Sequence, residues 1–156
     1  VMLTSLSSSC RSMEFESPTK NECGSLVYSF FQLAPDERLG KFATFDLDRQ
    51  YITYICGMRE IHPQPLYLAD AFSQEGKNAF PFLTKKLRET QSDSYFRYIV
   101  YVFSEMQRRS TYDVAAEKDL ILYMEKRASE IQHEFWRGYT KRLIEKIQSY
   151  SGETKK

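Results

Sequence analysis

The sequence has few of the residues that form tight turns: 6 glycines and 5 prolines among 156 residues. Glycine supplies positive φ angles and proline pre-sets turn geometry, so their scarcity leaves little material for β-hairpins or phosphate-binding loops. No Walker loop, GxGxxG or GxSxG motif occurs in the chain. The composition therefore favours helices and argues against the nucleotide-binding and hydrolase classes that depend on those motifs.

Residues that bind metals or act as nucleophiles are also rare, with 2 histidines and 3 cysteines in the chain. His62 and His133 are about 70 positions apart and belong to no HExxH or HxH motif. Glu60 near His62 and Glu134 beside His133 are the nearest approaches to metal-ligand pairs, and isolated pairs of this kind are common on surfaces. We therefore predict no metal site, no cofactor, no catalytic residues and no enzymatic activity.

A strong excess of one charge and a long apolar run are likewise missing. The net charge of +1 argues against a dedicated nucleic-acid-binding protein, which usually has a clear basic excess. The charge is uneven, because residues 1–76 hold about 6 basic and 10 acidic side chains and the remainder about 16 and 11. No stretch after the first residues approaches the roughly 18 apolar residues that a membrane span needs.

What the chain does contain is aromatic residues, at 15% of the sequence, with 11 Tyr, 11 Phe and a single Trp. Aromatic side chains bury large areas, and tyrosine keeps a polar tip for water or a partner. A chain of this size typically buries roughly 70% of the surface that it exposes when unfolded. The length and composition therefore predict one domain with a full hydrophobic core.

Helical periodicity and helix-start signals divide the chain into three parts. We expect a tail or signal-peptide remnant at residues 1–18, one helical domain at 19–150 and a second tail at 151–156. Pro35 before two carboxylates is typical of a helix start, and the segment from His62 to Pro65 breaks the chain. Tyr51–Ile55 is β-rich in composition, but no partner strand is evident, so we interpret it as helix. The predicted fold is all-α, a compact right-handed array of antiparallel helix pairs with about six or seven helices.

The first ten residues resemble the end of a bacterial lipoprotein signal peptide. In such signals an apolar stretch gives way to small residues just before a cysteine, which is lipidated after cleavage. Leu6, Ser8, Ser9 and Cys10 fit this pattern, whereas Ser7 departs from the leucine usual at its position. The resemblance implies lipidation of Cys10 and a location in the periplasm or cell envelope. The alternative is a serine-rich tail on a cytoplasmic protein.

Whether the other two cysteines, Cys23 and Cys56, form a disulfide depends on whether the protein is exported. If Cys10 is lipidated, the remaining pair is even in number and lies in an oxidising compartment, so a Cys23–Cys56 disulfide becomes plausible. If the protein is cytosolic, both are better interpreted as buried thiols.

The second half resembles a HEAT-type helical repeat. In the stretch Gly76–Leu87, Ala79 is followed two places later by Pro81 and then by leucines, as in the first helix of such a repeat. Residues 92–107 resemble its turn and second helix, and residues 116–149 a second, degenerate unit. The general layout also resembles small bacterial helical proteins, which implies no particular activity. What the HEAT resemblance implies is a scaffold that binds another protein.

A partner-binding surface is expected in this second half, where tyrosine and cationic side chains are not needed for the core. Tyrosine and arginine are enriched at protein interfaces. The residues predicted for this surface are Arg97, Tyr98, Tyr101, Arg108, Arg109, Tyr112 and Asp113, with Lys141 and Arg142 nearby. For the last two of the seven, the simpler interpretation is that Asp113 caps the next helix and Tyr112 packs over the edge of the core.

The function expected from these observations is that of a non-enzymatic, envelope-anchored helical scaffold for a protein partner of unknown identity. A cytosolic interaction module, such as an immunity-type inhibitor of a toxin, comes second, and a small helical enzyme third. Neither nucleic acid nor a small-molecule ligand is implied, and contact with a membrane is expected only through the lipid on Cys10.

Overall fold

The computed structural model describes residues 18–150, and this part of the chain is entirely helical, without strands. It contains eight α-helices and two short 3-10 helices, which confirms the predicted all-α class and exceeds the predicted six or seven helices. Tyr51–Ile55 lies within a helix, as predicted. The helices are α1 (Lys20–Ser29), α2 (Pro35–Ala43), α3 (Leu47–Glu60), α4 (Leu66–Ser73), η1 (Gly76–Asn78), α5 (Phe80–Glu89), α6 (Asp93–Arg108), η2 (Val114–Ala116), α7 (Lys118–Ser129) and α8 (Glu134–Tyr150).

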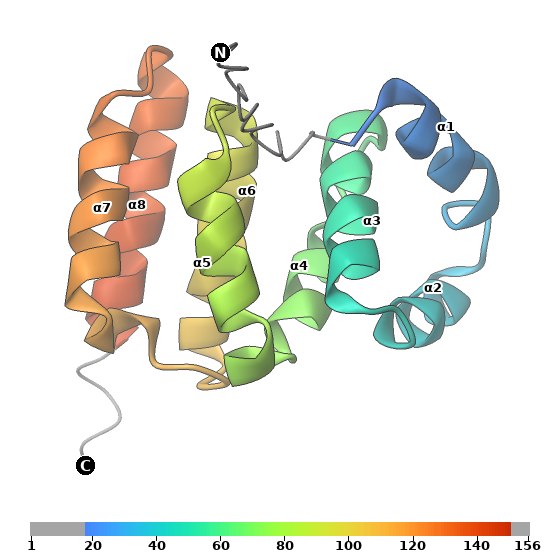
Figure 1. The fold of residues 1–156 in the computed structure, drawn as a ribbon, viewed down its shortest axis with the longest axis horizontal. Coiled ribbons are helices and arrows are strands. Elements are labelled where there is room, and N and C mark those ends of the chain that lie inside the picture. The colour runs from blue at the N-terminus through green and yellow to red at the C-terminus, as the bar shows by residue number, and fades with distance from the viewer. Residues whose placement is uncertain (1–17, 151–156) are drawn as a thin grey trace, which may run out of the picture.

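The helices pack in a regular order (Figure 1). The even-numbered helices form a row, in which α2 contacts α4, α4 contacts α6 and α6 contacts α8. Each of α3, α5 and α7 contacts the even-numbered helix that follows it, and α1 packs on α3. Helix α6 therefore lies inside the array, between α4 and α8.

Local signals in the sequence determine where the helices begin. The side chain of Thr19 accepts a hydrogen bond from the backbone N–H of Glu22, whose carboxylate accepts one from the backbone N–H of Thr19, forming a capping box. Asp46 and Ser92 cap α3 and α6 through their side-chain oxygens. Pro35 and Pro81 lie in the first turns of α2 and α5, where a missing N–H costs nothing.

The connection from α4 to α5 depends on Gly76. This residue has a φ of +51°, and a Cβ there would lie 2.5 Å from the carbonyl oxygen of Thr111. The Thr111 hydroxyl in turn donates a hydrogen bond of 2.6 Å to the carbonyl of Ser73 at the end of α4. Gly76 thus allows the loop after α6 to pack closely on the turn after α4.

Most of the large apolar and aromatic side chains lie in one continuous core that extends through all eight helices. Phe42, Phe72 and Tyr54 are fully buried and pack edge to face in sequence. The buried Tyr54 hydroxyl donates a hydrogen bond of 2.9 Å to the backbone carbonyl of Tyr98. Because burial disfavours the phenolate, the pKa of Tyr54 is raised well above its usual value.

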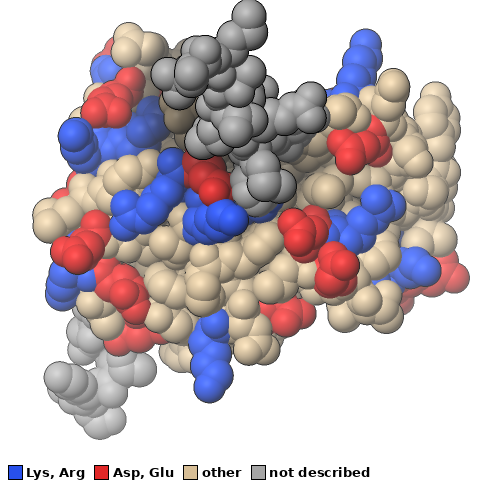
Figure 2. Space-filling model, in the orientation of Figure 1, with Lys and Arg blue, Asp and Glu red and all other residues tan. Residues whose placement is uncertain are grey.

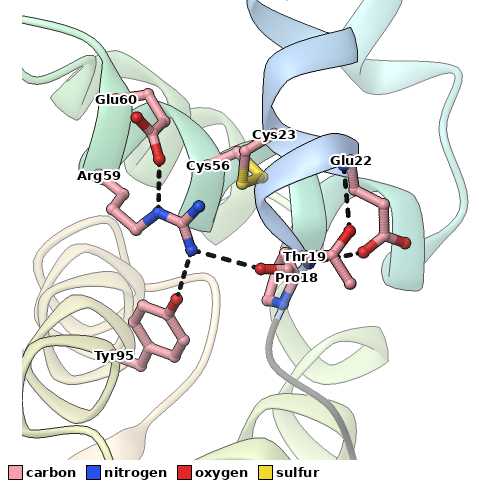
Figure 3. The surroundings of a disulfide bond; sticks show 8 residues. All are labelled: Pro18, Thr19, Glu22, Cys23, Cys56, Arg59, Glu60 and Tyr95. Carbon is pink, nitrogen blue, oxygen red and sulfur yellow. Dashed lines mark hydrogen bonds and ion pairs between the residues drawn. A yellow bond between two sulfur atoms is a disulfide. The ribbon is translucent and has the colours of Figure 1, made fainter.

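Cys23 and Cys56 are joined by a disulfide that links α1 to α3, with their Cα atoms 5.0 Å apart (Figure 3). Both residues are completely buried. Arg59 extends this link toward α6, since its guanidinium donates to the Pro18 carbonyl at 3.3 Å and to the Tyr95 hydroxyl at 3.0 Å. The adjacent Glu60 carboxylate accepts from Arg59 and is the main cause of the raised pKa of Arg59.

Two sequence predictions concern residues outside this description. Cys10 and the two predicted tails lie wholly or mostly outside residues 18–150, so the lipidation of Cys10 stays a prediction. Among the described residues, none of the helices has the length and hydrophobicity that crossing a membrane would require.

Gly57 marks a close contact within the core, and its replacement tests the packing there. A Cβ at Gly57 would lie 2.6 Å from the Phe31 ring and 2.8 Å from the Pro65 ring. We expect Gly57→Ala to lower the free energy of unfolding by about 1 to 3 kcal/mol, because overpacking outweighs the better helix propensity of alanine. Gly24, which has no neighbour within 4 Å of its Cβ position, is the matched control. Gly24→Ala should be neutral or stabilising by up to about 1 kcal/mol in the same urea unfolding measurement, and equal effects would contradict this account.

The disulfide should contribute substantially to stability, because it closes a loop with a sequence separation of 33. Chain-entropy arguments give about 3 to 4 kcal/mol for a loop of this length. We expect the double variant Cys23→Ala, Cys56→Ala to lose stability of that order in urea unfolding under non-reducing conditions. Adding a reductant should destabilise the wild type and leave the variant unchanged. A reductant effect of equal size on both proteins would rule out this contribution.

Candidate functional site

The residues predicted to bind a partner fall in different environments. Arg108 and Arg109 are exposed at the end of α6, and Tyr101 is half-buried. Arg97 and Tyr98, however, are only 6% and 7% exposed. The expectation that these two side chains are free of the core is therefore wrong.

Tyr98 belongs to the core because its ring and hydroxyl both have partners inside the protein. Its hydroxyl donates to the Met58 carbonyl at 3.4 Å and accepts from the Gln64 side chain at 3.3 Å. Its ring lies against that of Tyr54, with the centroids 6.5 Å apart. Tyr98 thus links α6 to the end of α3 and to the loop that follows it.

Arg97 is buried because aromatic rings cover its guanidinium group. The guanidinium carbon lies 3.9 Å from the centroid of the Trp136 ring and 5.2 Å from that of Tyr98. Such cation–π contacts contribute about 2 kcal/mol when they are desolvated. No carboxylate in residues 18–150 forms an ion pair with Arg97, so its charge is balanced only by aromatic rings.

A small cavity of about 70 Å³ adjoins Arg97 between α6 and α8. We call it the Arg97 cavity. The residues lining it come from four parts of the chain, and half of them are aromatic: Met58, Gln64, Leu66, Arg97, Tyr98, Tyr101, Trp136 and Tyr139. Burial raises the pKa values of both Tyr101 and Tyr139 and is the largest effect on each, while Arg97 and Arg142 act to lower that of Tyr139.

A cluster of charged side chains lies at the C-terminal end of α6, away from the Arg97 cavity. Asp70 of α4 pairs with Arg109 and, at 3.3 Å, with Arg108. Arg108 also pairs with Glu105 at 2.6 Å, and this hydrogen bond is the main cause of the raised pKa of Arg108. The two arginines and two carboxylates tie the end of α6 to α4.

The Arg97 cavity and this charge cluster lie along one face of α6. Arg97, Tyr101, Glu105 and Arg108 follow one another at spacings of four, four and three residues, which places them on the same side of a helix. The neighbouring even-numbered helices supply the flanks. We call this surface the α6 strip and define it by Leu66, Asp70, Arg97, Tyr101, Glu105, Arg108, Trp136 and Tyr139.

Tyr112 and Asp113 do not belong to the α6 strip and lie on the loop after α6. Tyr112 stacks on Phe80 with a centroid distance of 4.0 Å, in agreement with a position at the edge of the core. Its hydroxyl donates to the Glu117 carboxylate at 2.6 Å. The exposed Asp113 accepts from Gln107 and makes no capping hydrogen bond with its side chain, so the predicted helix-capping role is wrong.

Tyr112 and Phe80 also line a wider groove, of about 680 Å³, along α5. Its other lining residues are Pro81, Thr84, Lys85, Arg88 and Glu89. Lys85 and Glu89 form an i,i+4 ion pair, and Arg88 lies 4.6 Å from the centroid of the Tyr123 ring. Lys85 thus has an anionic partner, whereas Arg88 is exposed and contacts an aromatic ring.

The face of the molecule that includes α5 and α7 has a mixed surface. Figure 2 shows basic and acidic side chains interspersed across the part of this face that is not covered in grey.

Lys141 and Arg142, also considered for the binding surface, are exposed on α8.

Sequence reasoning missed several members of the α6 strip. Leu66 and Trp136 are among the exposed large hydrophobic residues, at 41% and 36% exposure. The helical spacing from Arg97 to Arg108 was visible in the sequence, and so was the single tryptophan near the start of the last helix. Their proximity was not visible, because it depends on how α4 and α8 pack against α6.

Within residues 18–150, no group of three or more His, Cys, Asp or Glu side chains is arranged to hold a metal ion.

Comparison with known proteins gives no further assignment, because no protein family, curated protein or solved structure matches this chain significantly.

The hydrogen bond between Tyr112 and Glu117 predicts a dependence of stability on pH. This bond and partial burial raise the pKa of Tyr112 to about 12, whereas an unfolded tyrosine titrates near about 10. The protonated phenol is thus favoured in the folded state, and its contribution is complete below about pH 10 and lost as the pH rises toward about 12. We expect Tyr112→Phe to lose less stability than the wild type across this window, measured by urea midpoints. Identical losses in both proteins would show that the hydrogen bond contributes nothing.

Proposed function

We propose that the protein is a non-enzymatic helical scaffold that binds another protein through the α6 strip. The observation that supports this proposal most directly is a buried arginine, held among Trp136 and three tyrosines, beside exposed apolar side chains. Tryptophan, tyrosine and arginine are the residues that most often dominate binding energy at protein interfaces. The charged side chains of Asp70, Glu105 and Arg108 border the apolar part of the strip on one side, as polar residues border the centre of many interfaces.

The proposed architecture is a short right-handed array of helix pairs, similar to HEAT repeats. In support, α5 with α6 and α7 with α8 form neighbouring pairs, and the even-numbered helices form a continuous row. In repeat proteins of this kind, one row of helices presents the extended binding surface. The α6 strip lies on the row of α4, α6 and α8, where such a surface is expected.

We further propose that the protein works in the cell envelope, anchored by a lipid on Cys10. The buried Cys23–Cys56 disulfide supports this, because disulfides persist in oxidising compartments and are rare in the cytosol. A cytosolic interaction module, such as an inhibitor of a toxin, is the alternative. Purification of the protein from its native cells with the two thiols fully reactive to alkylation would favour that alternative.

A pull-down at about physiological ionic strength tests the binding surface, since the screening length is then roughly 8 Å and long-range charge attraction is weak. We expect the double variant Tyr101→Ala, Arg108→Ala to recover at least about tenfold less of a specific partner than the wild type, because both side chains lie on the strip. Binding through apolar and aromatic contacts should weaken only modestly when the salt is raised from about 50 to 200 mM. A loss of about a thousandfold over that range would indicate nucleic acid instead.

The matched control is Arg88→Ala, Tyr123→Ala, which removes the same two residue types from the surface of α5 and α7. This pair makes a cation–π contact away from the α6 strip. We expect the control variant to retain the partner. Equal recovery by both double variants would count against the α6 strip, and catalytic turnover by the pure protein would overturn the non-enzymatic assignment.

A further inference from the structure

The Arg97 cavity contains a positive charge that has no anionic partner among residues 18–150. Arg97 is 6% exposed, and its guanidinium makes neither a hydrogen bond nor an ion pair with another residue of the described chain. Every other arginine in the same region has an anionic or carbonyl partner or is exposed, as Arg108 and Arg142 illustrate. The cation–π contacts stabilise this charge. None of the Arg97 nitrogens is among the fully enclosed, unpaired polar atoms of residues 18–150, so the unpaired N–H groups stay accessible to an anion from the solvent.

The geometry indicates what kind of group completes the site. The guanidinium carbon lies 3.9 Å from the centroid of the Trp136 ring. None of the guanidinium N–H groups donates a hydrogen bond to another residue of the described chain, so they remain to bind a ligand. A guanidinium presents those N–H groups as a planar fork, which fits the two oxygens of a carboxylate. The volume of about 70 Å³ exceeds the roughly 10 to 15 Å³ that a cavity needs to hold one water molecule. The cavity therefore has room for a small group rather than for a large ligand.

Two further donors line the same cavity. The hydroxyls of Tyr101 and Tyr139 make no hydrogen bond to any residue in the described part of the chain, whereas the Tyr98 hydroxyl already donates to the Met58 carbonyl. No carboxylate lines the cavity. An anion that enters thus meets one cation and two hydroxyl donors, and no negatively charged side chain of residues 18–150 lines the cavity to repel it.

We propose that the Arg97 cavity binds a carboxylate group, with Arg97 as its principal ligand and the Tyr101 and Tyr139 hydroxyls as additional donors. This inference rests on the proposed function, since it names the chemical group that a partner inserts into the α6 strip. The group is supplied by an acidic side chain or chain end of a protein partner, or by a small free acid. Leu66 and Trp136 are the exposed large hydrophobic residues of the lining, and they contact the apolar part of the molecule that carries the carboxylate.

Trp136 makes the site directly observable, because it is the only tryptophan in the sequence and lies against Arg97. Acetate is titrated into the full-length protein at neutral pH while chloride keeps the ionic strength constant, and the fluorescence of Trp136 is recorded. Acetamide, which has nearly the same shape and no charge, is the matched control ligand. We expect a saturable change with acetate and none with acetamide. An equal response to both, or no saturation with acetate, overturns the proposal.

Three variants test the assigned ligands. Arg97→Met should abolish the saturable response, and Arg97→Lys should weaken acetate binding by about tenfold, because an ammonium group lacks the planar fork. Tyr101→Phe should also weaken it by about tenfold through the loss of one hydrogen bond to a charged group. Circular dichroism verifies that each variant is folded. If Arg97→Met is unfolded, the two conservative variants carry the test. Unchanged acetate affinity in both of them overturns the assignment of the ligands.

A second set of titrations identifies the source of the carboxylate. An acidic peptide is compared with its Asn/Gln counterpart and with free succinate. Tighter binding of the acidic peptide than of succinate identifies a protein partner, and the reverse identifies a small acid; both results support the carboxylate site. The pull-down is independent of this assay. Acetate binding without any recovered partner would refute the scaffold alone, and partner recovery without acetate binding would refute the carboxylate site alone.

Discussion

The packing of α6 between α4 and α8 is the constraint on which the rest of the structure depends. Helix α6 contacts these two helices as well as α5, α3 and η2, and most of its residues are buried. A helix enclosed in this way has to bury polar side chains together with apolar ones, because apolar residues do not occupy its whole circumference. The distinctive features of the molecule arise from how those polar groups are accommodated.

Three of the buried polar or amphipathic residues of α6 show two ways of stabilising such groups. Gln107 is held by hydrogen bonds, since its side chain donates to Asp113 and accepts from the backbone N–H of Ala115. Tyr98 is held by hydrogen bonds with the end of α3 and the following loop. The guanidinium of Arg97 contacts the rings of Trp136 and Tyr98 and makes no hydrogen bond or ion pair within residues 18–150. Gln107 fixes the loop after α6, Tyr98 fixes the loop between α3 and α4, and Arg97 leaves the site that we interpret as functional.

The sequence was sufficient to predict the fold class and much of the segmentation, because these depend on local chemistry. Helix caps at Asp46 and Ser92, prolines in first turns and the break at His62–Pro65 all act within a few residues of where they occur. Tyr51–Ile55 shows the limit of composition, since a β-rich segment became helical through its burial in α3. Tertiary packing outweighed intrinsic propensity there.

The candidate site was predicted less well, for a physical reason. The sequence marks Arg97 and Tyr98 as polar or amphipathic, and side chains of this kind usually reach the surface. Their burial depends on Trp136, Met58 and Gln64, which lie about 30 to 40 positions away in the sequence and approach only when the array is complete. A site formed between helices cannot be derived from the periodicity of any one of them.

The disulfide between α1 and α3 also determines how the domain responds to mechanical force. A chain held at its N-terminal end transmits tension along the backbone to Cys23 and then directly through the sulfur–sulfur bond to Cys56. Residues 24–55, which include the whole of α2 and most of α1 and α3, therefore lie outside the path of the load. Beyond the disulfide, a pull from that end acts on the last turn of α3 and on the core around it, and α2 stays wound while the tension lasts.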